Sequence, residues 1–129
     1  MAAKVNRIGH YISVIILKAL GYSLHGYEDN DRLDGGAGDD WLVGGTGDDI
    51  FVFKANGGWD GIADFEVHNG STSGDVIELH DQSVSNFTDL MANAVEWNGT
   101  SYIQLDNGDG MTLHGVTLNE LTADDFSFV

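Results

Sequence analysis

A nine-residue pattern repeats three times without interruption from Gly26 to Val52. Units two and three, residues 35–43 and 44–52, both read Gly-Gly-x-Gly-x-Asp-x-apolar-x. Unit one, residues 26–34, keeps the first Gly, the sixth-position Asp and the eighth-position apolar residue. Because one unit is too small to bury its own apolar side chain, tandem units of this length predict a coil of stacked turns.

The first six residues of each unit suit a tight loop, and the last three suit a short strand. Glycines adopt backbone angles that are closed to other residues, so the loop can turn its carbonyl groups inward. The sixth-position Asp adds a carboxylate, and oxygen ligands in a flexible loop favour a hard cation, above all Ca²⁺. The eighth-position side chains are expected to share one core: Leu33, Leu42 and Phe51.

The repeat resembles the RTX, or haemolysin-type calcium-binding, family, most specifically over residues 26–52 and more loosely up to residue 129. The resemblance implies a mainly β fold, in which a short parallel β-roll (RTX β-helix) continues into a carboxy-terminal β region. If each turn of the coil uses two units, the loop 26–31 lies above the loop 44–49. One Ca²⁺ is then expected between these loops, with Asp31 and Asp49 as its carboxylate ligands.

The loop 35–40 lies on the opposite side of this coil and needs a different partner. The stretch 56–60 resembles a degenerate loop, so Asp40 is expected to share a second ion with Asp60. Asp64 is a further candidate ligand of this ion, with a cap at the end of a strand as its alternative role. The expected cofactor is therefore about two Ca²⁺ ions. The candidate metal ligands, through carboxylates or loop carbonyls, are Gly26, Glu28, Asp31, Gly35, Ala37, Asp40, Gly44, Thr46, Asp49, Asp60 and Asp64.

The charge of the chain also predicts folding that depends on calcium. The 129 residues carry a formal charge of −16, and residues 26–52 contain 8 of the 21 acidic residues. Two Ca²⁺ would change this charge from −16 to −12 where repulsion is strongest, so folding and calcium binding are expected to be one event. The acidity argues against a nucleic-acid partner, and the absence of Cys excludes disulfides. These features fit a secreted, extracellular bacterial protein.

The sequence contains no arrangement of residues typical of catalysis. The doublets 39–40 and 48–49 look like paired carboxylates, but adjacent loop residues diverge, and only the second Asp of each falls at the ligand position. His10 resembles the end of the His-Glu-x-x-His zinc helix of RTX-bearing serralysin proteases. Asn6 and Arg7 stand where that motif has its first His and its Glu. The chain is therefore not expected to be an enzyme.

The segment before the repeats has a different character. Residues 4–20 place apolar residues at helical spacing, which predicts an amphipathic helix that ends at Gly21 and caps the coil. A signal peptide, or a contact surface for a membrane or another subunit, stays open as an alternative. The segment is too short and too polar to span a bilayer, so stable membrane insertion is not expected. One domain is expected, with a cap at 1–23, a β-roll at 24–65 and a carboxy-terminal β region at 66–129.

The part after the repeats is expected to consist mainly of strands. Three segments read as strands: 49–53, 59–65 and 74–79. A short helix is expected near 86–94, starting at Ser85. The segments 101–106 and 111–116 flank Asn-Gly-Asp-Gly, which predicts a β-hairpin.

The tail 123–129 places an acidic pair before a short apolar terminus. It resembles the signals read by type I (ABC-transporter) secretion systems, and it also suits a last strand of the sheet. The resemblance implies a calcium-binding module that folds outside the cell and supports type I secretion of its parent protein. The alternatives are an adhesin module and a module that binds extracellular polysaccharide, as in alginate epimerases. The aromatic candidates for stacking on sugars are Trp41, Trp59, Trp97 and Tyr102.

Overall fold

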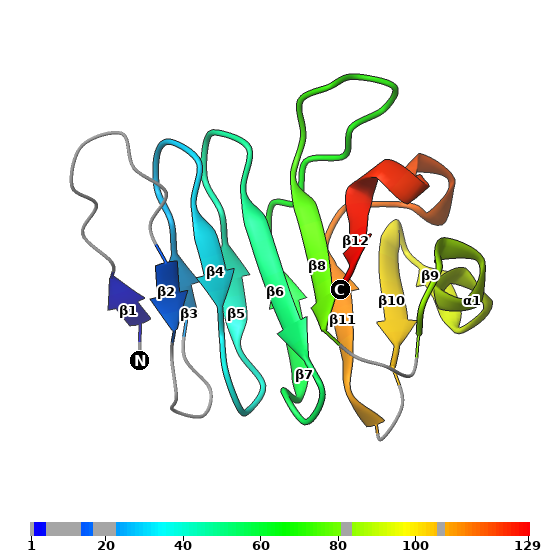
Figure 1. Ribbon diagram of the computed structural model, residues 1–129, viewed down its shortest axis with the longest axis horizontal. Coiled ribbons are helices and arrows are strands. Elements are labelled where there is room, and N and C mark those ends of the chain that lie inside the picture. Colours follow the sequence, from blue (N-terminus) through cyan, green and yellow to red (C-terminus); the bar gives the residue numbers. More distant parts are fainter. Residues whose placement is uncertain (1, 5–13, 17–22, 81–83, 106–107) are drawn as a thin grey trace.

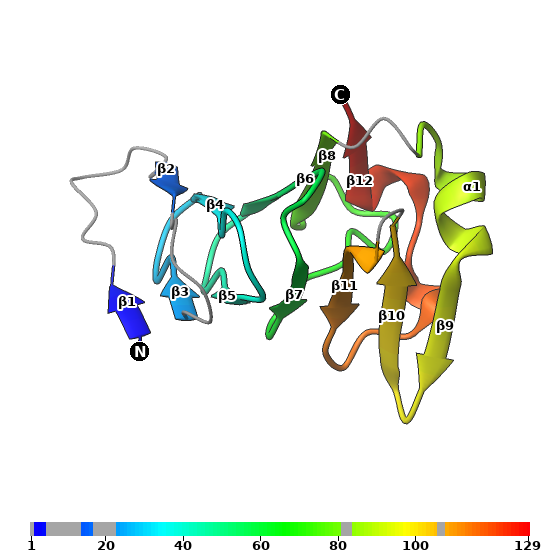
Figure 2. The same ribbon diagram turned by 90° about the horizontal axis from the view of Figure 1, so that it is seen from below.

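The computed structural model describes residues 2–4, 14–16, 23–80, 84–105 and 108–129. Within these residues the strands form two sheets, which Figure 2 shows as separate layers. The seven-stranded sheet contains, in spatial order, β1 (Ala2–Lys4), β3 (Ser23–His25), β5 (Trp41–Val43), β7 (Trp59–Ile62), β11 (Gly110–Leu113), β10 (Thr100–Gln104) and β9 (Ala94–Trp97). The five-stranded sheet contains β12 (Phe126–Phe128), β8 (Val76–His80), β6 (Ile50–Lys54), β4 (Arg32–Asp34) and β2 (Val14–Ile16).

From β1 to β8 the successive strands alternate between the two sheets, so that this part of the chain forms a coil (Figure 1). β4 pairs in parallel with β6, with Leu33 opposite Phe51. β3 pairs in parallel with β5, with Leu24 opposite Leu42. Units one and three therefore lie side by side, and each turn of the coil uses two units, as the repeat predicts.

The eighth-position side chains fill the space between the sheets. Leu33, Leu42 and Phe51 are 0% exposed, and Leu24 continues the same period one unit earlier. The core continues into the carboxy-terminal region through Ile77 and other buried apolar residues. The expectation of a mainly β fold with a parallel β-roll is thus confirmed.

The amino-terminal part differs from the expectation of a helix over residues 4–20. Val14–Ile16 form β2, which pairs in parallel with β4 so that Ile15 stands opposite Leu33. Lys4, the last residue of β1, and Val14–Ile16 thus lie in strands where the sequence predicts a helix. Ile15 lies nine residues before Leu24, and its β-branched neighbours favour a strand. Residues 5–13 and 17–20 of the expected helix lie outside the described residues. No helix in the described part of the chain is long and apolar enough to cross a membrane.

The carboxy-terminal region contains the expected helix and hairpin. α1 spans Phe87–Ala92, and its cap is Asn86 rather than Ser85, because the Asn86 side chain accepts a hydrogen bond from the backbone N–H of Asp89 at 2.8 Å. β10 and β11 form the antiparallel hairpin. β9 adds a strand at the edge of this hairpin that the sequence analysis did not predict.

The tail forms the last strand of the five-stranded sheet. It enters through two short 3₁₀ helices, η2 (Leu118–Glu120) and η3 (Ala123–Asp125). β12 then pairs in parallel with β8, with Phe126 opposite Ile77. The expectation that the tail completes the sheet is therefore confirmed.

Candidate metal centre

The loops 26–31 and 44–49 lie directly against each other, as expected for units one and three. The backbone N–H of Thr46 donates to the carbonyl of Tyr27 at 2.8 Å. The backbone N–H of Asp31 donates to Oδ1 of Asp49 at 2.9 Å. These bonds bring the two sixth-position carboxylates together from adjacent turns of the coil.

The first glycine of each unit leaves room for these carboxylates. A Cβ atom on Gly26 would lie 2.6 Å from Oδ2 of Asp31 and 2.6 Å from the carbonyl oxygen of Gly44. A Cβ atom on Gly44 would collide with Oδ2 of Asp49. The loops therefore converge as a cradle of oxygen atoms that only glycine permits at these positions.

Asp49 is the residue whose surroundings fit a bound cation best. Its side chain is 1% exposed, and no residue that the structure describes donates a hydrogen bond to its Oδ2. Burial raises the pKa of Asp49 to about 8, and the neighbouring charges of Asp75, Asp31 and Asp64 raise it further. A buried carboxylate of this kind is stabilised in its charged form by a divalent cation, so Asp49 fits the expected Ca²⁺.

The opposite side of the coil repeats this arrangement with a degenerate loop. The backbone N–H of Asp40 donates to Oδ1 of Asp60 at 2.9 Å, as Asp31 does to Asp49. Burial raises the pKa of Asp60 to about 8, and the charge of Asp40 is the largest electrostatic contribution to this increase. A cavity of about 290 Å³ lies beside this pair, lined by Ala37, Gly57 and Asp60 among others. The sequence predicts this pairing of Asp40 with Asp60.

Asp64 lies at a different place from the one expected. Its Oδ1 accepts a hydrogen bond from the backbone N–H of Gly44 at 2.9 Å, and its Oδ2 accepts one from Gly45 at 2.8 Å. Asp64 thus supports the loop 44–49 and does not join Asp40 and Asp60. The reason is topological, because Asp64 follows β7 whereas Asp60 lies within it, and the ends of a strand face opposite sides of the coil.

Asp75 is an acidic residue of this region that the sequence analysis missed. Its Oδ1 accepts from the backbone N–H of Asp49 at 2.9 Å, and its Oδ2 accepts from Glu66 at 2.8 Å. Burial raises its pKa to about 7. Asp31, Asp49 and Asp75 therefore form one column through the coil. The sequence feature that could have identified Asp75 is the spacing Asp-x-apolar. Asp75 shows this spacing with Ile77, as the sixth-position Asp residues of the repeat show it with the eighth-position residues.

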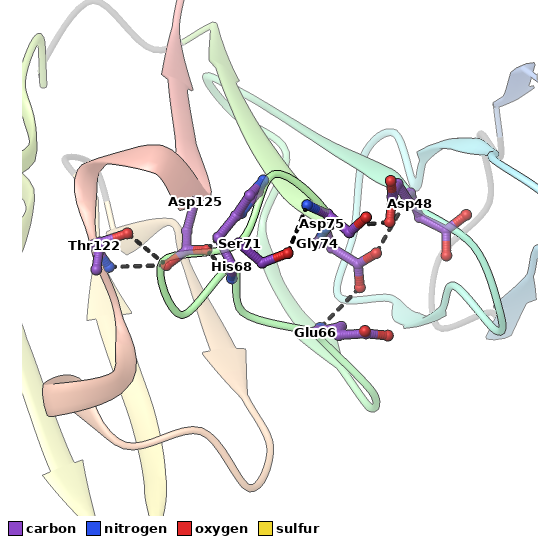
Figure 3. Close-up of polar contacts among 10 residues, drawn as sticks. Asp48, Glu66, His68, Ser71, Gly74, Asp75, Thr122 and Asp125 are labelled. Carbon is purple, nitrogen blue, oxygen red and sulfur yellow. Dashed lines mark hydrogen bonds and ion pairs between the residues drawn. The ribbon is translucent and has the colours of Figure 1, made fainter.

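A chain of polar contacts links this column to the tail (Figure 3). The backbone N–H of Gly74 donates to Oδ1 of Asp48 at 3.1 Å, beside Asp75. Asp125 is 0% exposed, and its Oδ1 accepts from the backbone N–H of His68 at 2.9 Å. Its Oδ2 accepts from the backbone N–H of Thr122 at 2.8 Å. The tail thus holds the segment that brings Asp75 against the loop 44–49.

In the candidate metal sites, backbone carbonyl groups would have to supply many of the oxygen ligands. The described residues contain no group of three or more His, Asp or Glu side chains that would hold a metal ion by themselves. Of the candidate ligands, Glu28, Ala37 and Thr46 have exposed side chains, so they fit the set only through their carbonyl groups. The first-position glycines are buried between the turns: Gly26, Gly35 and Gly44.

Comparison with known proteins agrees with this geometry. Residues 25–55 match the family model described as RTX calcium-binding nonapeptide repeat (4 copies). Over these residues the chain is similar to RTX calcium-binding repeats. The matched segment contains Asp31, Asp40 and Asp49.

The fold of the whole chain is similar to a solved structure. The crystal structure of the extracellular lipase LipA from Serratia marcescens matches with a TM-score of 0.60 and 23% sequence identity. The match covers 99% of this chain and 21% of the lipase chain. At this level of identity, the likeness shows a shared fold. A comparison with curated proteins found no match.

Proposed function

We propose that this chain is a calcium-dependent folding module that binds about two Ca²⁺ ions between its stacked loops. The observation that carries the proposal is Asp49, a buried carboxylate whose Oδ2 accepts no hydrogen bond from any described residue. The first ion would lie between the loops 26–31 and 44–49, held by Asp31, Asp49 and loop carbonyls. The second would lie near Asp40 and Asp60.

The Ca²⁺ ions would offset the electrostatic repulsion among the carboxylates of the coil and the cost of burying their charges. The buried carboxylates of Asp49 and Asp60 resist ionisation, since burial raises the pKa of both to about 8. Without a cation, the coil therefore either takes up protons or opens at neutral pH. With Ca²⁺ bound, the charged form is favoured, and metal binding becomes part of the free energy of folding. The chain's own part is to place these oxygen atoms together, and no catalysis is proposed for it.

This proposal is tested by removing calcium and by removing one ligand. Far-UV circular dichroism and thermal melting are measured with Ca²⁺ and with EGTA. Ca²⁺ should produce the β spectrum and raise the melting temperature, and calorimetric titration should give about two ions per chain. Asp49→Asn should weaken calcium-induced folding by on the order of 10- to 100-fold, because it removes one charged ligand.

The matched control is the neighbouring residue of the same doublet. Asp48→Asn removes the same charge from the same loop, but its side chain is exposed and its amide oxygen can still accept from Gly74. It should change the calcium midpoint by only a few-fold. The proposal is falsified if EGTA leaves both the spectrum and the melting temperature unchanged.

We further propose that the module serves a bacterial protein secreted by a type I system. The acidic chain would stay unfolded where calcium is scarce and would fold outside the cell, at roughly millimolar Ca²⁺. The pairing of β12 supports this order of events, because a tail held in the sheet is accessible to a transporter only before folding. Removing residues 123–129 should abolish export by a co-expressed type I apparatus. Undiminished export of the shortened chain would contradict a signal in the tail.

A further inference from the structure

The seven-stranded sheet presents aromatic side chains on its outward face. Trp41, Trp59, Tyr102 and Trp97 come from β5, β7, β10 and β9, which lie in one sheet with β11 between β7 and β10 (Figure 2). The register places Trp41, Gly61, Thr112 and Tyr102 on one face of the sheet, and alternation along the strands adds Trp59 and Trp97 to the same face, which is the outward one because Leu42 and Ile103 are buried. We call this surface, formed by Trp41, Trp59, Tyr102 and Trp97, the aromatic face.

The strand register places part of this face in one straight row. Trp41 stands opposite Gly61, and Gly61 stands opposite Thr112. Thr112 in turn stands opposite Tyr102. Neighbouring strands are about 4.8 Å apart, so Trp41 and Tyr102, at the two ends of this row, are separated by three strand spacings, or about 14 Å. Trp97 on β9 stands opposite Thr100 on β10, two residues along that strand from Tyr102.

The two tryptophans nearest the coil are held against the sheet. Cε3 and Cζ3 of Trp41 both lie 2.7 Å from the position that a Cβ on Gly61 would occupy. Cε3 of Trp59 lies 2.6 Å from the same position on Gly110, and its Nε1 donates to Oγ1 of Thr112 at 2.7 Å. The glycines make room for the rings, which are therefore positioned before any ligand arrives. Such pre-organisation lowers the entropy cost of binding.

The aromatic face is uncharged although the chain as a whole is strongly acidic. None of the outward residues of β5, β7, β9, β10 and β11 is Asp, Glu, Lys or Arg, in a chain with a formal charge of −16. The outward face of the five-stranded sheet differs, since it carries Arg32, Asp34, Lys54 and Glu78. Two side chains of the aromatic face are exposed to solvent, Trp41 by 39% and Trp97 by 70%.

We propose that the aromatic face binds a neutral polysaccharide. Sugar rings present faces of C–H groups with partial positive charge, which stack on the electron-rich faces of aromatic rings. A neutral chain would meet an uncharged strip, whereas a polyanionic glycan would be repelled by the surrounding acidic loops. The side chains of this site are not candidate metal ligands, although Trp41 directly follows Asp40 and Trp59 directly precedes Asp60 in the chain.

The test uses the whole chain loaded with calcium. Binding of cellohexaose, xylan and laminarin is measured by calorimetry and affinity electrophoresis, with alginate as the polyanionic probe. At least one neutral glycan should bind more tightly than alginate. Trp97→Ala should weaken that binding by about tenfold or more, and Trp97→Phe should largely retain it. Trp41→Ala should weaken it as well.

Controls separate binding from folding. Because Trp97 is 70% exposed, Trp97→Ala should leave the calcium midpoint of folding unchanged. Lys54→Ala, on the outward face of the other sheet, should leave glycan binding unchanged. The proposal is overturned if none of the three neutral glycans binds, if alginate binds best, or if neither tryptophan variant weakens binding. It is also overturned if sedimentation shows a dimer that Trp97→Ala abolishes, because a second copy would then occupy the face.

Discussion

At the scale of single residues, the backbone angles of the loops explain why the repeat is rich in glycine. In units two and three, the left-handed positions are occupied by glycine, as at Gly36 with a φ of 78° and Gly45 with a φ of 87°. In unit one, Tyr27 and Asp29 adopt φ values of 74° and 68° at the equivalent positions. The stack of loops therefore imposes this conformation on non-glycine residues, at a cost of about 1–2 kcal/mol each.

Two glycines with similar angles allow conformational strain to be separated from close packing. Gly45 and Gly99 have φ values of 87° and 76°, but a Cβ on Gly45 would collide with the carbonyl oxygen of Tyr27, whereas Gly99 faces open space. Gly99→Ala should lower the free energy of unfolding by about 1–2 kcal/mol and still fold with calcium. Gly45→Ala should abolish calcium-induced folding.

Urea unfolding at saturating calcium, together with a calcium titration followed by circular dichroism, measures both effects. Equal losses of stability in the two variants would show that backbone strain alone explains the glycine, and that the close approach of the loops at Gly45 contributes nothing.

At the scale of elements, strands of three to five residues are too short to be stable in isolation, and side chains on their outer surface tie them together. Nη1 of Arg32 on β4 donates to Oε2 of Glu78 on β8 at 2.7 Å, across the intervening strand β6. Nη2 of Arg32 contacts Oε1 of Glu78 at 2.5 Å. Val52 on β6 is only 2% exposed although it faces outward, next to Glu78 in the register. The ion pair therefore connects β4 to β8 across β6 and stabilises these three strands of the five-stranded sheet.

This ion pair predicts a specific dependence of stability on pH. The hydrogen bond from Arg32 lowers the pKa of Glu78 from its usual value of 4.5 to about 2. Because the pKa is lower in the folded protein, the stabilisation is present above pH 4.5 and is lost as the pH falls through the range down to about 2. Glu78→Gln should therefore cost about 1–3 kcal/mol at pH 6, and this difference should shrink toward pH 2–3.

The measurement is urea unfolding of the wild type and Glu78→Gln at constant calcium, over a series of pH values. A double-mutant cycle with Arg32→Gln isolates the pair from other groups that titrate in this range. A difference between wild type and variant that does not depend on pH would rule out this ion pair as its source.

At the scale of the whole molecule, the tail is connected to the calcium-binding loops through buried polar contacts. Asp125 holds the backbone of His68, in the segment that places Asp75 against Asp49 (Figure 3). Asp125 therefore contributes to a site whose candidate ligand Asp49 lies 76 residues earlier in the chain. Folding of the tail and binding of calcium should consequently support each other.

The doublet in the tail offers a matched pair of variants to test this coupling. Asp125 is 0% exposed, whereas Asp124 is exposed. Asp125→Ala should raise the calcium concentration at the midpoint of folding several-fold, since loss of a buried acceptor costs about 1–3 kcal/mol. Asp124→Ala should leave this midpoint nearly unchanged. Equal midpoints for the two variants in a titration followed by circular dichroism would show that the tail and the loops are not coupled.

The amino-acid sequence by itself determined the features that depend on the nine-residue period. The pairing of Asp31 with Asp49 follows from it, because two units of nine residues complete one turn and bring equivalent positions into register. The pairing of Asp40 with Asp60, 20 residues apart, was still recognisable because the degenerate loop is close to the same length. The helix and the hairpin were predictable for a similar reason, since caps and turns are local signals.

Only the tertiary structure decided the features that depend on neighbours without this period. Asp75 stands in the same column as Asp49 although 26 residues separate them, because the longer connection between their strands bulges out of the coil. Val14–Ile16 form a strand rather than a helix because the open side of β4 provides a partner for pairing. The aromatic face likewise exists because β9, β10 and β11 extend the sheet of the coil laterally, which brings together side chains that no sequence period relates.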